Sequence, residues 1–312
     1  MRIIKQLAQY FAINESKVML FLVDAPNKYK IYKIPKRSSG YRIIAQPSKK
    51  LKEYQRAFLK LYHFPIHKAA MAYCEGKSIK DNALSHIHGQ YLLKTDFENF
   101  FGSITPSVFW NCIENCTEKV PHFSIPERKI VEKILFWRPT KNKDGKLVLS
   151  VGAPSSPVLS NFCLYEFDRL LDSLCSERGI VYTRYADDLT FSTNTKDILY
   201  PLIPIIQELL IKLFQHALKI NHSKTIFSSK AHNRHVTGIT INNEGKLSLG
   251  RERKRFIKHL IHQFKYNQLD KFDIDYLKGL LSFASYIEQD FIIRLKQKYS
   301  AELIDKIYKE GS

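Results

Sequence analysis

Two aspartates stand next to each other at Asp187 and Asp188, between two segments rich in β-branched and aromatic residues. These arms, residues 179–186 and 189–193, are each long enough for one strand, so the pair is predicted to lie at the tip of a β-hairpin. Adjacent carboxylates repel each other, and a cation in front of them relieves that repulsion. A divalent metal ion is the expected cation, although a solvated turn is an alternative that aspartates also favour.

A metal site of this kind needs a further acid from another part of the chain. Mg²⁺ binds several oxygen ligands, and two-metal phosphoryl transfer uses carboxylates that bridge both ions. Asp96 is the candidate, because it ends an apolar run, residues 91–95, that predicts a buried strand. Asp96 could instead cap the helix expected after it, and the sequence leaves both alternatives open.

The formal net charge of the 312 residues is +19, and most of it lies in two segments. Residues 28–60 carry 11 basic side chains and one acid, and residues 219–258 carry 10 basic side chains and two acids. Basic segments around an acidic centre suit an enzyme that holds nucleic acid by its phosphates while the centre does the chemistry. Two solvated basic faces are the simpler alternative.

The chain has the composition of a globular protein, with 44% hydrophobic residues. Its longest apolar run, residues 18–23, is too short to cross a bilayer, and its N-terminal segment predicts an amphipathic helix rather than a signal peptide. The five cysteines form no Cys-x-x-Cys pair, and their odd number argues against a secreted disulfide framework. We therefore expect a cytoplasmic protein without a membrane partner.

Three further segments contribute to the functional interpretation. The small residues at 152–157 precede an amphipathic pattern that predicts one long helix over residues 158–175. Small residues at a helix entrance let a ligand approach the backbone closely, whereas a plain tight turn is the alternative. A helix is also predicted over residues 78–88, with Asn82 and His86 on one face, and the chain is predicted to be helical from Arg251 onward.

Together these segments resemble the reverse transcriptase family over nearly the whole chain. Residues 185–188, Tyr-Ala-Asp-Asp, resemble the family's catalytic hairpin, and Asp96 with Phe97 resembles its first metal-binding strand. Residues 152–157 resemble the template and nucleotide loop, and residues 221–225 resemble the segment that carries a lysine near the leaving pyrophosphate.

More narrowly, residues 82–86 and 236–238 match two signatures of bacterial retron reverse transcriptases. One position departs from the commonest family pattern, because Val151 stands where glutamine usually precedes the Gly-Ala-Pro-Ser-Ser-Pro loop. A side-chain hydrogen bond from that glutamine is therefore not expected here, while the loop backbone can still shape a nucleotide site.

The resemblance implies an α+β, right-hand polymerase fold with fingers, palm and thumb. Fingers with N-terminal helices are expected at residues 1–90, a palm with inserted finger helices at 91–245, and a helical thumb at 246–312. It also implies an RNA-directed DNA polymerase that uses two Mg²⁺ ions. The implied metal ligands are Asp96, Asp187, Asp188 and the backbone carbonyl of Phe97.

The resemblance further implies a site for deoxynucleoside triphosphates. Its expected residues are Arg42, Phe101, Gly152, Ala153, Pro154 and Lys224, with Lys36 as a weaker candidate beside Arg42. In the family an aromatic ring at the place of Phe101 lies under the sugar and leaves no room for a 2′-hydroxyl. One of the two adjacent rings, Phe100 or Phe101, is expected to be a core residue instead.

For a retron enzyme the implied template is a structured non-coding RNA whose guanosine 2′-hydroxyl is the primer, and the implied product is branched multicopy single-stranded DNA. The residues expected to contact that RNA are Asn82, His86, Val236, Thr237, Gly238, Arg251, Arg255 and Lys258. An antiviral role with an effector protein is implied as well. The alternatives are an RNA-templated RNA polymerase and an inactive scaffold that binds structured RNA and a protein partner.

Overall fold

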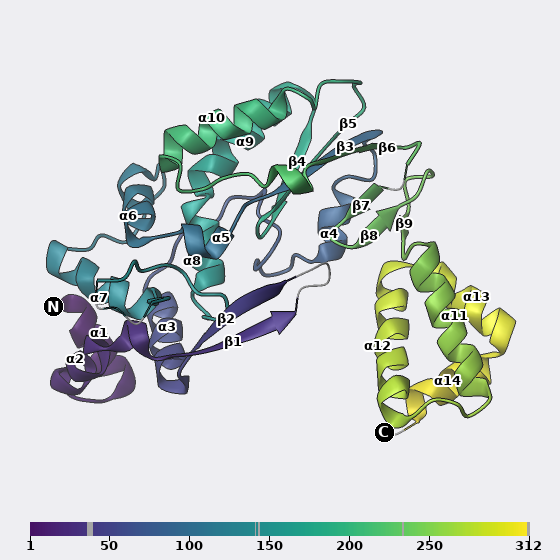
Figure 1. The fold of residues 1–312 in the computed structure, drawn as a ribbon, viewed down its shortest axis with the longest axis horizontal. Helices are drawn as coiled ribbons and strands as arrows, with labels where there is room; N and C mark the ends of the chain where they lie inside the picture. Colours follow the sequence, from purple (N-terminus) through teal and green to yellow (C-terminus); the bar gives the residue numbers. More distant parts are fainter. Residues whose placement is uncertain (36–39, 141, 143, 233, 311–312) are drawn as a thin grey trace.

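The computed structural model describes residues 1–35, 40–140, 142, 144–232 and 234–310. Its centre is an antiparallel sheet of four strands, which are β3 (Tyr91–Asp96), β4 (Val181–Tyr185), β5 (Asp188–Thr193) and β6 (Ile226–Ser229). Their order across the sheet is β4-β5-β3-β6, so β5, the second strand of the acidic hairpin, lies beside the strand that ends at Asp96 (Figure 1).

The two faces of this sheet belong to two hydrophobic cores. Leu93 of β3 points into the larger core, where helices α9 (Tyr165–Glu177) and α10 (Leu202–Phe214) cover the sheet (Figure 1). The neighbouring residue Leu92 points to the other face and joins the second core. That second face is covered in part by α4 (Ile79–Leu84), a helix that starts with a capping box between Ser78 and Asp81.

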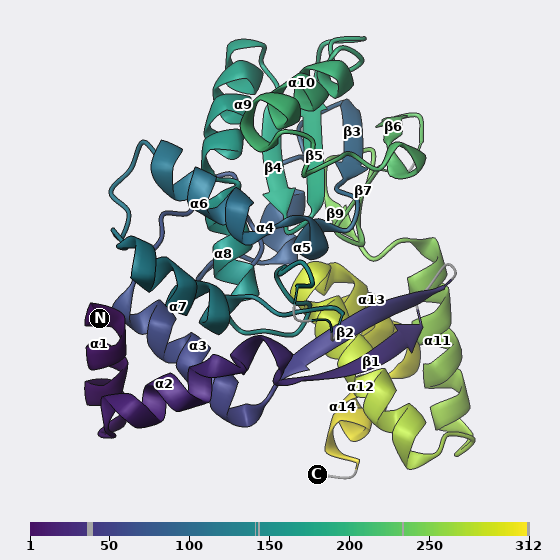
Figure 2. The same cartoon turned by 60° about the vertical axis from the view of Figure 1, so that its left-hand side comes forward.

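The N-terminal part combines helices with a long hairpin. Its helices are α1 (Arg2–Phe11), α2 (Glu15–Val23), α3 (Lys49–Leu61) and α7 (Ile125–Leu135), and a short 3₁₀ turn, η1 (Ala25–Asn27), precedes the hairpin. Strands β1 (Tyr29–Pro35) and β2 (Tyr41–Pro47) pair in antiparallel register and extend toward the C-terminal helices (Figure 1, Figure 2). The first part of the basic segment of residues 28–60 therefore forms a largely exposed hairpin beside the sheet.

The C-terminal part is a small sheet followed by a helical lobe. The sheet consists of β7 (Arg234–Val236), β8 (Ile239–Ile241) and β9 (Leu247–Ser248). The helices are α11 (Arg251–Lys265), α12 (Lys271–Ile287), α13 (Gln289–Tyr299) and α14 (Ala301–Lys309). Leu277, Leu281 and Leu295 are fully or almost fully buried between them, so the lobe, at the yellow end of Figure 1, has a core of its own.

The prediction of one long helix over residues 158–175 is wrong in one respect. The structure has two helices there, α8 (Ser156–Cys163) and α9, separated at Leu164, where φ is −92° and ψ is 7°. The helix predicted over residues 78–88 is also shorter, because regular α-helix ends at Leu84. The remaining short helices are α5 (Phe100–Ser103), α6 (Pro106–Asn115) and η2 (His222–Lys224).

The larger core runs from Ile3 to Ile220 and therefore joins the N-terminal helices to the central sheet. The second core gathers Ala83, Leu92 and apolar residues between Val236 and Ile307. The division at residues 90/91 and 245/246 stays a prediction. Among the described residues, no helix is both long enough and apolar enough to span a bilayer.

Candidate active site

The acidic pair lies at a hairpin tip, as predicted. Tyr185 pairs with Asp188 at the ends of β4 and β5, which leaves Ala186 and Asp187 in the turn. Ala186 has a left-handed backbone with φ of 57°. This conformation is uncommon outside glycine, and it turns the chain sharply enough to re-aim the carboxylate that follows.

Asp96 lies directly opposite Asp188 in the antiparallel register of β3 and β5. Directly opposed residues place their side chains on the same face of a sheet, so these two carboxylates are neighbours. The backbone N–H of Phe97 donates to the carbonyl of Asp187 at 3.1 Å, which fixes the turn against the end of β3. Helix α5 begins after an N-cap at Asn99, so the capping alternative for Asp96 is excluded.

The three carboxylates influence one another electrostatically. Burial first, and then the charges of Asp187 and Asp96, raise the pKa of Asp188 to about 6. Burial and Asp96 also raise the pKa of Asp187. Lys224 Nζ forms an ion pair with Asp96 Oδ2, and this hydrogen bond raises the pKa of Lys224. The site therefore favours cations.

The donor set suits a divalent ion that binds oxygen. Asp96 is only 4% exposed, and its Oδ1 atom has no hydrogen-bond partner among the described residues. Carboxylate and carbonyl oxygens are the ligands that Mg²⁺ prefers. No three His, Cys, Asp or Glu side chains in the described part of the chain are already grouped tightly enough to hold a metal ion. The residues thus fit such an ion, and side-chain rearrangement, including release of Lys224 from Asp96, would complete its shell.

A cavity of about 260 Å³ has Tyr73 in its wall, two residues after Met71, whose N–H donates to the carbonyl of Arg184, so the cavity lies near the hairpin. Phe101, Gly152, Ala153 and Pro154, four of the residues predicted to bind the nucleotide, all line it. The adjacent Phe100 is only 3% exposed and packs in the larger core. The structure therefore distinguishes the two rings, and Phe101 is the one that faces the cavity.

Gly152 allows the loop to lie against β2. Its φ is +122°, and a Cβ atom there would lie 3.2 Å from the carbonyl oxygen of Ala45. The carbonyl of Val151, in turn, accepts a 3.0 Å hydrogen bond from the N–H of Ala45. The backbone of Val151 thus fastens the loop to β2 without the side-chain amide of the usual glutamine.

A second cavity, of about 340 Å³, has two of the carboxylates in its wall. Asp96, Asp188, Lys224, Thr237 and Gly238 are among its lining residues. It brings two segments that are distant in the sequence to the same acidic centre. Because Thr237 and Gly238 border this space, they are accessible to a large ligand.

Arg42 lies on the exposed surface of β2 and does not line either of these two cavities. Its charge opposes the rise in the pKa of Asp187, so the guanidinium lies within electrostatic reach of the acidic centre. Lys36, the weaker candidate, lies outside the described residues.

Three of the residues expected to contact RNA are instead buried. Asn82, His86 and Val236 each have 0% exposure. The ring nitrogens of His86 lie 2.8 Å from Ser192 Oγ and 2.7 Å from Thr183 Oγ1. Thr183 also donates to the side-chain oxygen of Asn82 at 2.6 Å. The expectation of direct RNA contact is wrong for these side chains, because the polar atoms of Asn82 and His86 fasten α4 to the sheet and Val236 packs in the second core.

Arg251, Arg255 and Lys258 are exposed on α11, so their side chains are free to meet a polyanion. Lys254, on the same helix, is different, because it pairs at 2.6 Å with Glu288, the residue that precedes α13. The basic face of α11 therefore combines accessible charges with one that supports the lobe.

Sequence analysis missed Tyr73, which lines the cavity together with Phe101. Its backbone is left-handed with φ of 60°, and burial and the charge of Asp187 raise the pKa of its hydroxyl. An aromatic residue in this conformation is an outlier that no sequence pattern signals. Sequence analysis also missed the buried pair Arg184 and Asp168, although a charge within an apolar strand is a detectable signal.

Three carboxylates at the end of a sheet, a cavity with an aromatic wall and basic surfaces on two sides define a class of protein: polymerases that copy a nucleic-acid template. Residues 34–241 match the family model described as Reverse transcriptase (RNA-dependent DNA polymerase).

Curated relatives narrow this class. A retron Ec83 reverse transcriptase of Escherichia coli is 49% identical over 91% of this chain and 91% of its own. A retron Ec86 reverse transcriptase of the same organism is 29% identical over 94% of this chain and 89% of its own. A solved telomerase structure from Candida albicans has a TM-score of 0.47 and 14% identity over 89% of this chain and 56% of that one, too distant to add to the argument.

The chain belongs to the reverse transcriptase family, among the retron reverse transcriptases, and it is an RNA-directed DNA polymerase. The α+β right-hand fold of the reverse transcriptase type is confirmed with it.

Proposed function

We propose that this polymerase copies a structured non-coding RNA into branched multicopy single-stranded DNA and starts from a guanosine 2′-hydroxyl of that RNA. The observation that carries the catalytic part is the register of Asp96 opposite Asp188, at the wall of the second cavity. The retron part is supported by the relative that is 49% identical. The cytoplasmic location stays a prediction.

Asp96, Asp187, Asp188 and the carbonyl of Phe97 would hold two Mg²⁺ ions. When bound, such ions lower the pKa of the attacking hydroxyl and stabilise charge on the attacking and leaving oxygens. Lys224 then leaves Asp96 and protonates the departing pyrophosphate. Its hydrogen bond to Asp96 raises its pKa, so release from Asp96 removes that effect and makes the ammonium group a better proton donor.

The cavity beside the hairpin would hold the incoming deoxynucleotide. Phe101 packs under the sugar, where its ring excludes a 2′-hydroxyl, while the backbone at Gly152, Ala153 and Pro154 lets the base and template approach closely. Arg42 contacts the triphosphate from β2, because a guanidinium can donate two parallel hydrogen bonds to phosphate oxygens.

The RNA would lie along the basic side of the molecule. Arg251, Arg255 and Lys258 neutralise its phosphates, and Thr237 and Gly238 meet it at the mouth of the second cavity. The antiviral role with an effector protein is supported by the family resemblance. Plaque counts on cells that carry the native gene cluster would test it, because the role requires that Asp187→Ala with Asp188→Ala abolishes protection.

Extension of a DNA primer on an RNA template tests the catalytic proposal. The double variant Asp187→Ala with Asp188→Ala should lose about 10³-fold or more of its Mg²⁺-dependent rate, because no ligand remains on the hairpin. Its affinity for the RNA should stay within about twofold, since neither acid contacts phosphate. Extension at the wild-type rate would refute the assignment of the site.

The nucleic acid that co-purifies with the protein tests the priming proposal. We expect DNA joined to RNA through a 2′–5′ bond, which a debranching enzyme separates into two strands. DNA that carries no attached RNA before this treatment would contradict priming from a 2′-hydroxyl.

A further inference from the structure

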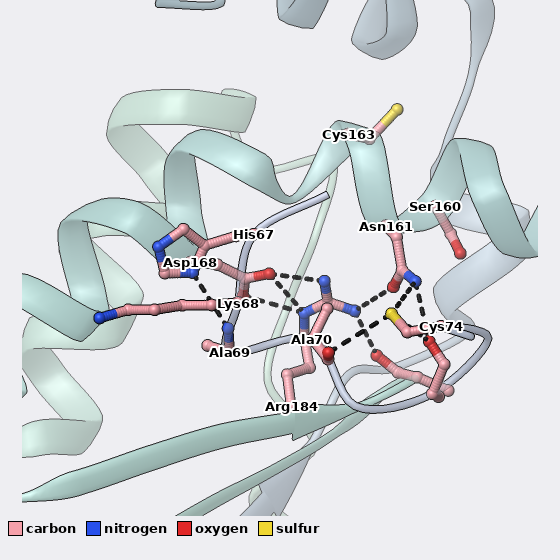
Figure 3. Close-up of polar contacts among 12 residues, drawn as sticks. His67, Lys68, Ala69, Ala70, Cys74, Ser160, Asn161, Cys163, Asp168 and Arg184 are labelled. Carbon is pink, nitrogen blue, oxygen red and sulfur yellow. Dashed lines mark hydrogen bonds and ion pairs between the residues drawn. The ribbon is translucent and has the colours of Figure 1, made fainter. Parts of the chain in front are cut away.

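Beneath the acidic hairpin lies an ion pair that is closed to solvent. Arg184 of β4 and Asp168 of α9 both have 0% exposed side chains. Nη2 of the guanidinium donates to Oδ2 of Asp168 at 2.6 Å, and Nε donates to Oδ1 at 2.9 Å (Figure 3). The pair belongs to the sheet face that α9 covers, opposite to the face that carries Asp188.

The same guanidinium reaches the turn of the hairpin. Nη1 of Arg184 donates to the carbonyl of Ala186 at 3.0 Å and to the side-chain oxygen of Asn161 at 3.0 Å. Ala186 is the left-handed residue that immediately precedes Asp187. The arginine thus holds the backbone conformation on which the direction of that carboxylate depends.

Arg184 and Asn161 also hold the segment that precedes Tyr73. The Asn161 side chain donates to the carbonyl of Ala72 at 2.9 Å (Figure 3). The backbone of Arg184 exchanges hydrogen bonds with the same segment, because its N–H donates to Ala69 and its carbonyl accepts from Met71. Tyr73 follows in a left-handed conformation at the wall of the nucleotide cavity.

A purely structural need would not select these residues. A buried ion pair is costly to desolvate, and well-packed apolar residues of similar volume usually serve stability as well or better. An arginine is required where several acceptors must be bound at fixed angles by one planar group. Here those acceptors are the carbonyl of Ala186, next to Asp187, and the side-chain oxygen of Asn161, which in turn binds the segment before Tyr73.

We propose that Arg184, Asp168 and Asn161 form a positioning unit for nucleotidyl transfer, which sets the spacing between the catalytic hairpin and the nucleotide cavity. None of the three lines the two cavities beside the carboxylates, so they are positioning residues and not catalytic ones. This inference rests on the proposed role of Asp187 and Asp188.

Arg184→Lys is the conservative test. Lysine keeps the charge pair with Asp168, but its single nitrogen cannot also hold the Ala186 carbonyl and Asn161 at the arginine geometry. We expect kcat to fall about tenfold or more, because small misplacements of reacting groups lower the rate strongly. RNA affinity and the KM for deoxynucleotide should change less than about threefold.

Arg234→Lys is the matched control. Arg234 is the other arginine with 0% exposure among the described residues, and it donates to the backbone carbonyls of Gly89 and Asn242. Its replacement makes the same arginine-to-lysine change at a buried site in a different sheet. We expect its kcat to stay within about twofold of the wild type, which separates positioning from a general loss of stability.

The double variant Arg184→Met with Asp168→Leu separates folding from positioning. Removing both charges should return the melting temperature toward the wild-type value, above that of Arg184→Met alone. Its kcat should nevertheless remain low. Hydrogen exchange of the protein without metal should be faster than in the wild type at residues 185–189 and 69–74, a readout that does not depend on activity.

The inference is overturned if Arg184→Lys has the wild-type kcat. It is also overturned if the double variant Arg184→Met with Asp168→Leu has the wild-type kcat and wild-type hydrogen exchange at residues 185–189 and 69–74. The double variant Asp187→Ala with Asp188→Ala distinguishes this failure from failure of the proposed function. If that variant is inactive while Arg184→Lys is fully active, the positioning unit is wrong and the catalytic site stands. If that variant is active, the proposed function itself is wrong.

Discussion

At the scale of residues, the site concentrates negative charge where neutral packing would be more stable. Asp96 and Asp188 face each other across two strands, and the pKa of Asp188 rises to about 6 as a result of burial and its neighbours. Lys224 neutralises one of the carboxylates. The remaining repulsion between the carboxylates favours the binding of further positive charge, which metal ions supply.

Phe101→Ala should weaken the selection of deoxynucleotides. Removing the ring opens the cavity wall under the sugar, so incorporation of ribonucleotides should rise about tenfold or more relative to deoxynucleotides, in line with about 1–3 kcal/mol of steric discrimination. The measurement is the ratio of kcat/KM for the two nucleotides on one RNA template.

Phe100→Leu is the control for this change. Phe100 is packed in the core, so its replacement should lower stability and leave the selectivity ratio as it is. An unchanged ratio in Phe101→Ala, or an equal shift in both variants, would place the sugar contact elsewhere.

His86 should make stability depend on pH. Burial lowers its pKa from 6.5 to about 3, so the folded protein keeps it neutral while the unfolded chain binds a proton below pH 6.5. This contribution is complete above pH 6.5 and is lost as the pH falls toward 3. By linkage, about 2 kcal/mol of the free energy of unfolding should disappear between about pH 7.5 and pH 5.

His86→Gln removes this titration and tests it. The variant is less stable than the wild type near neutral pH, because it leaves the hydroxyls of Ser192 and Thr183 poorly paired. Urea unfolding should show the gap between the two proteins narrowing as the pH falls to about 5. A gap of constant size would mean that His86 becomes protonated in the folded protein.

Residues were predictable where the signal was local. The β-rich arms around the acidic pair predicted its place at a hairpin tip. The apolar run before Asp96 predicted a strand that ends at this residue. Asn82, His86 and Val236 were expected to contact RNA because they lie in signature motifs. Such a motif does not report whether its side chains are buried. Tyr73 had no signal at all, since its left-handed backbone is imposed by tertiary contacts.

At the scale of elements, the break between α8 and α9 has a clear structural consequence. Asn161 lies before the break and Asp168 lies after it, yet both bind the guanidinium of Arg184. One amphipathic pattern runs through both helices, and periodicity alone therefore predicted a single helix. The backbone leaves helical geometry at Leu164, where φ is −92° and ψ is 7°, a local change that the apolar periodicity does not signal.

Helix α11 should contribute strongly to the salt dependence of RNA binding. Replacing Arg251, Arg255 and Lys258 by Gln removes up to three phosphate-binding side chains. The slope of log K against log salt should become shallower by roughly 0.7–0.9 for each phosphate that is no longer neutralised. Binding titrations at several salt concentrations measure this slope directly.

Three exposed lysines on other helices form the control set: Lys5, Lys17 and Lys212. Their replacement by Gln removes the same amount of charge from α1, α2 and α10, away from the second cavity. We expect their slope to match the wild type. Equal effects of the two sets would mean that the RNA responds to net charge rather than to α11.

At the scale of the whole molecule, basic surface and acidic centre come from different parts of the chain. The hairpin of β1 and β2 supplies one basic segment together with α3, and the region from η2 to α11 supplies the other. The core from Ile3 to Ile220 joins the N-terminal helices to the central sheet, while the helical lobe has its own core. The charge distribution along the sequence predicted this arrangement, whereas the sharing of one core by residues before and after 90 depends on tertiary packing that periodicity does not report.

The central claim is that folding gathers Asp96, Asp187 and Asp188 around metal ions. Crystals of the ternary complex with RNA template, DNA primer and a non-hydrolysable deoxynucleotide, soaked in Mn²⁺, test it by anomalous diffraction. The account predicts two ion peaks among these three carboxylates, with Lys224 withdrawn from Asp96. Carboxylates that stay apart with no ion among them, although all substrates are bound, would contradict it.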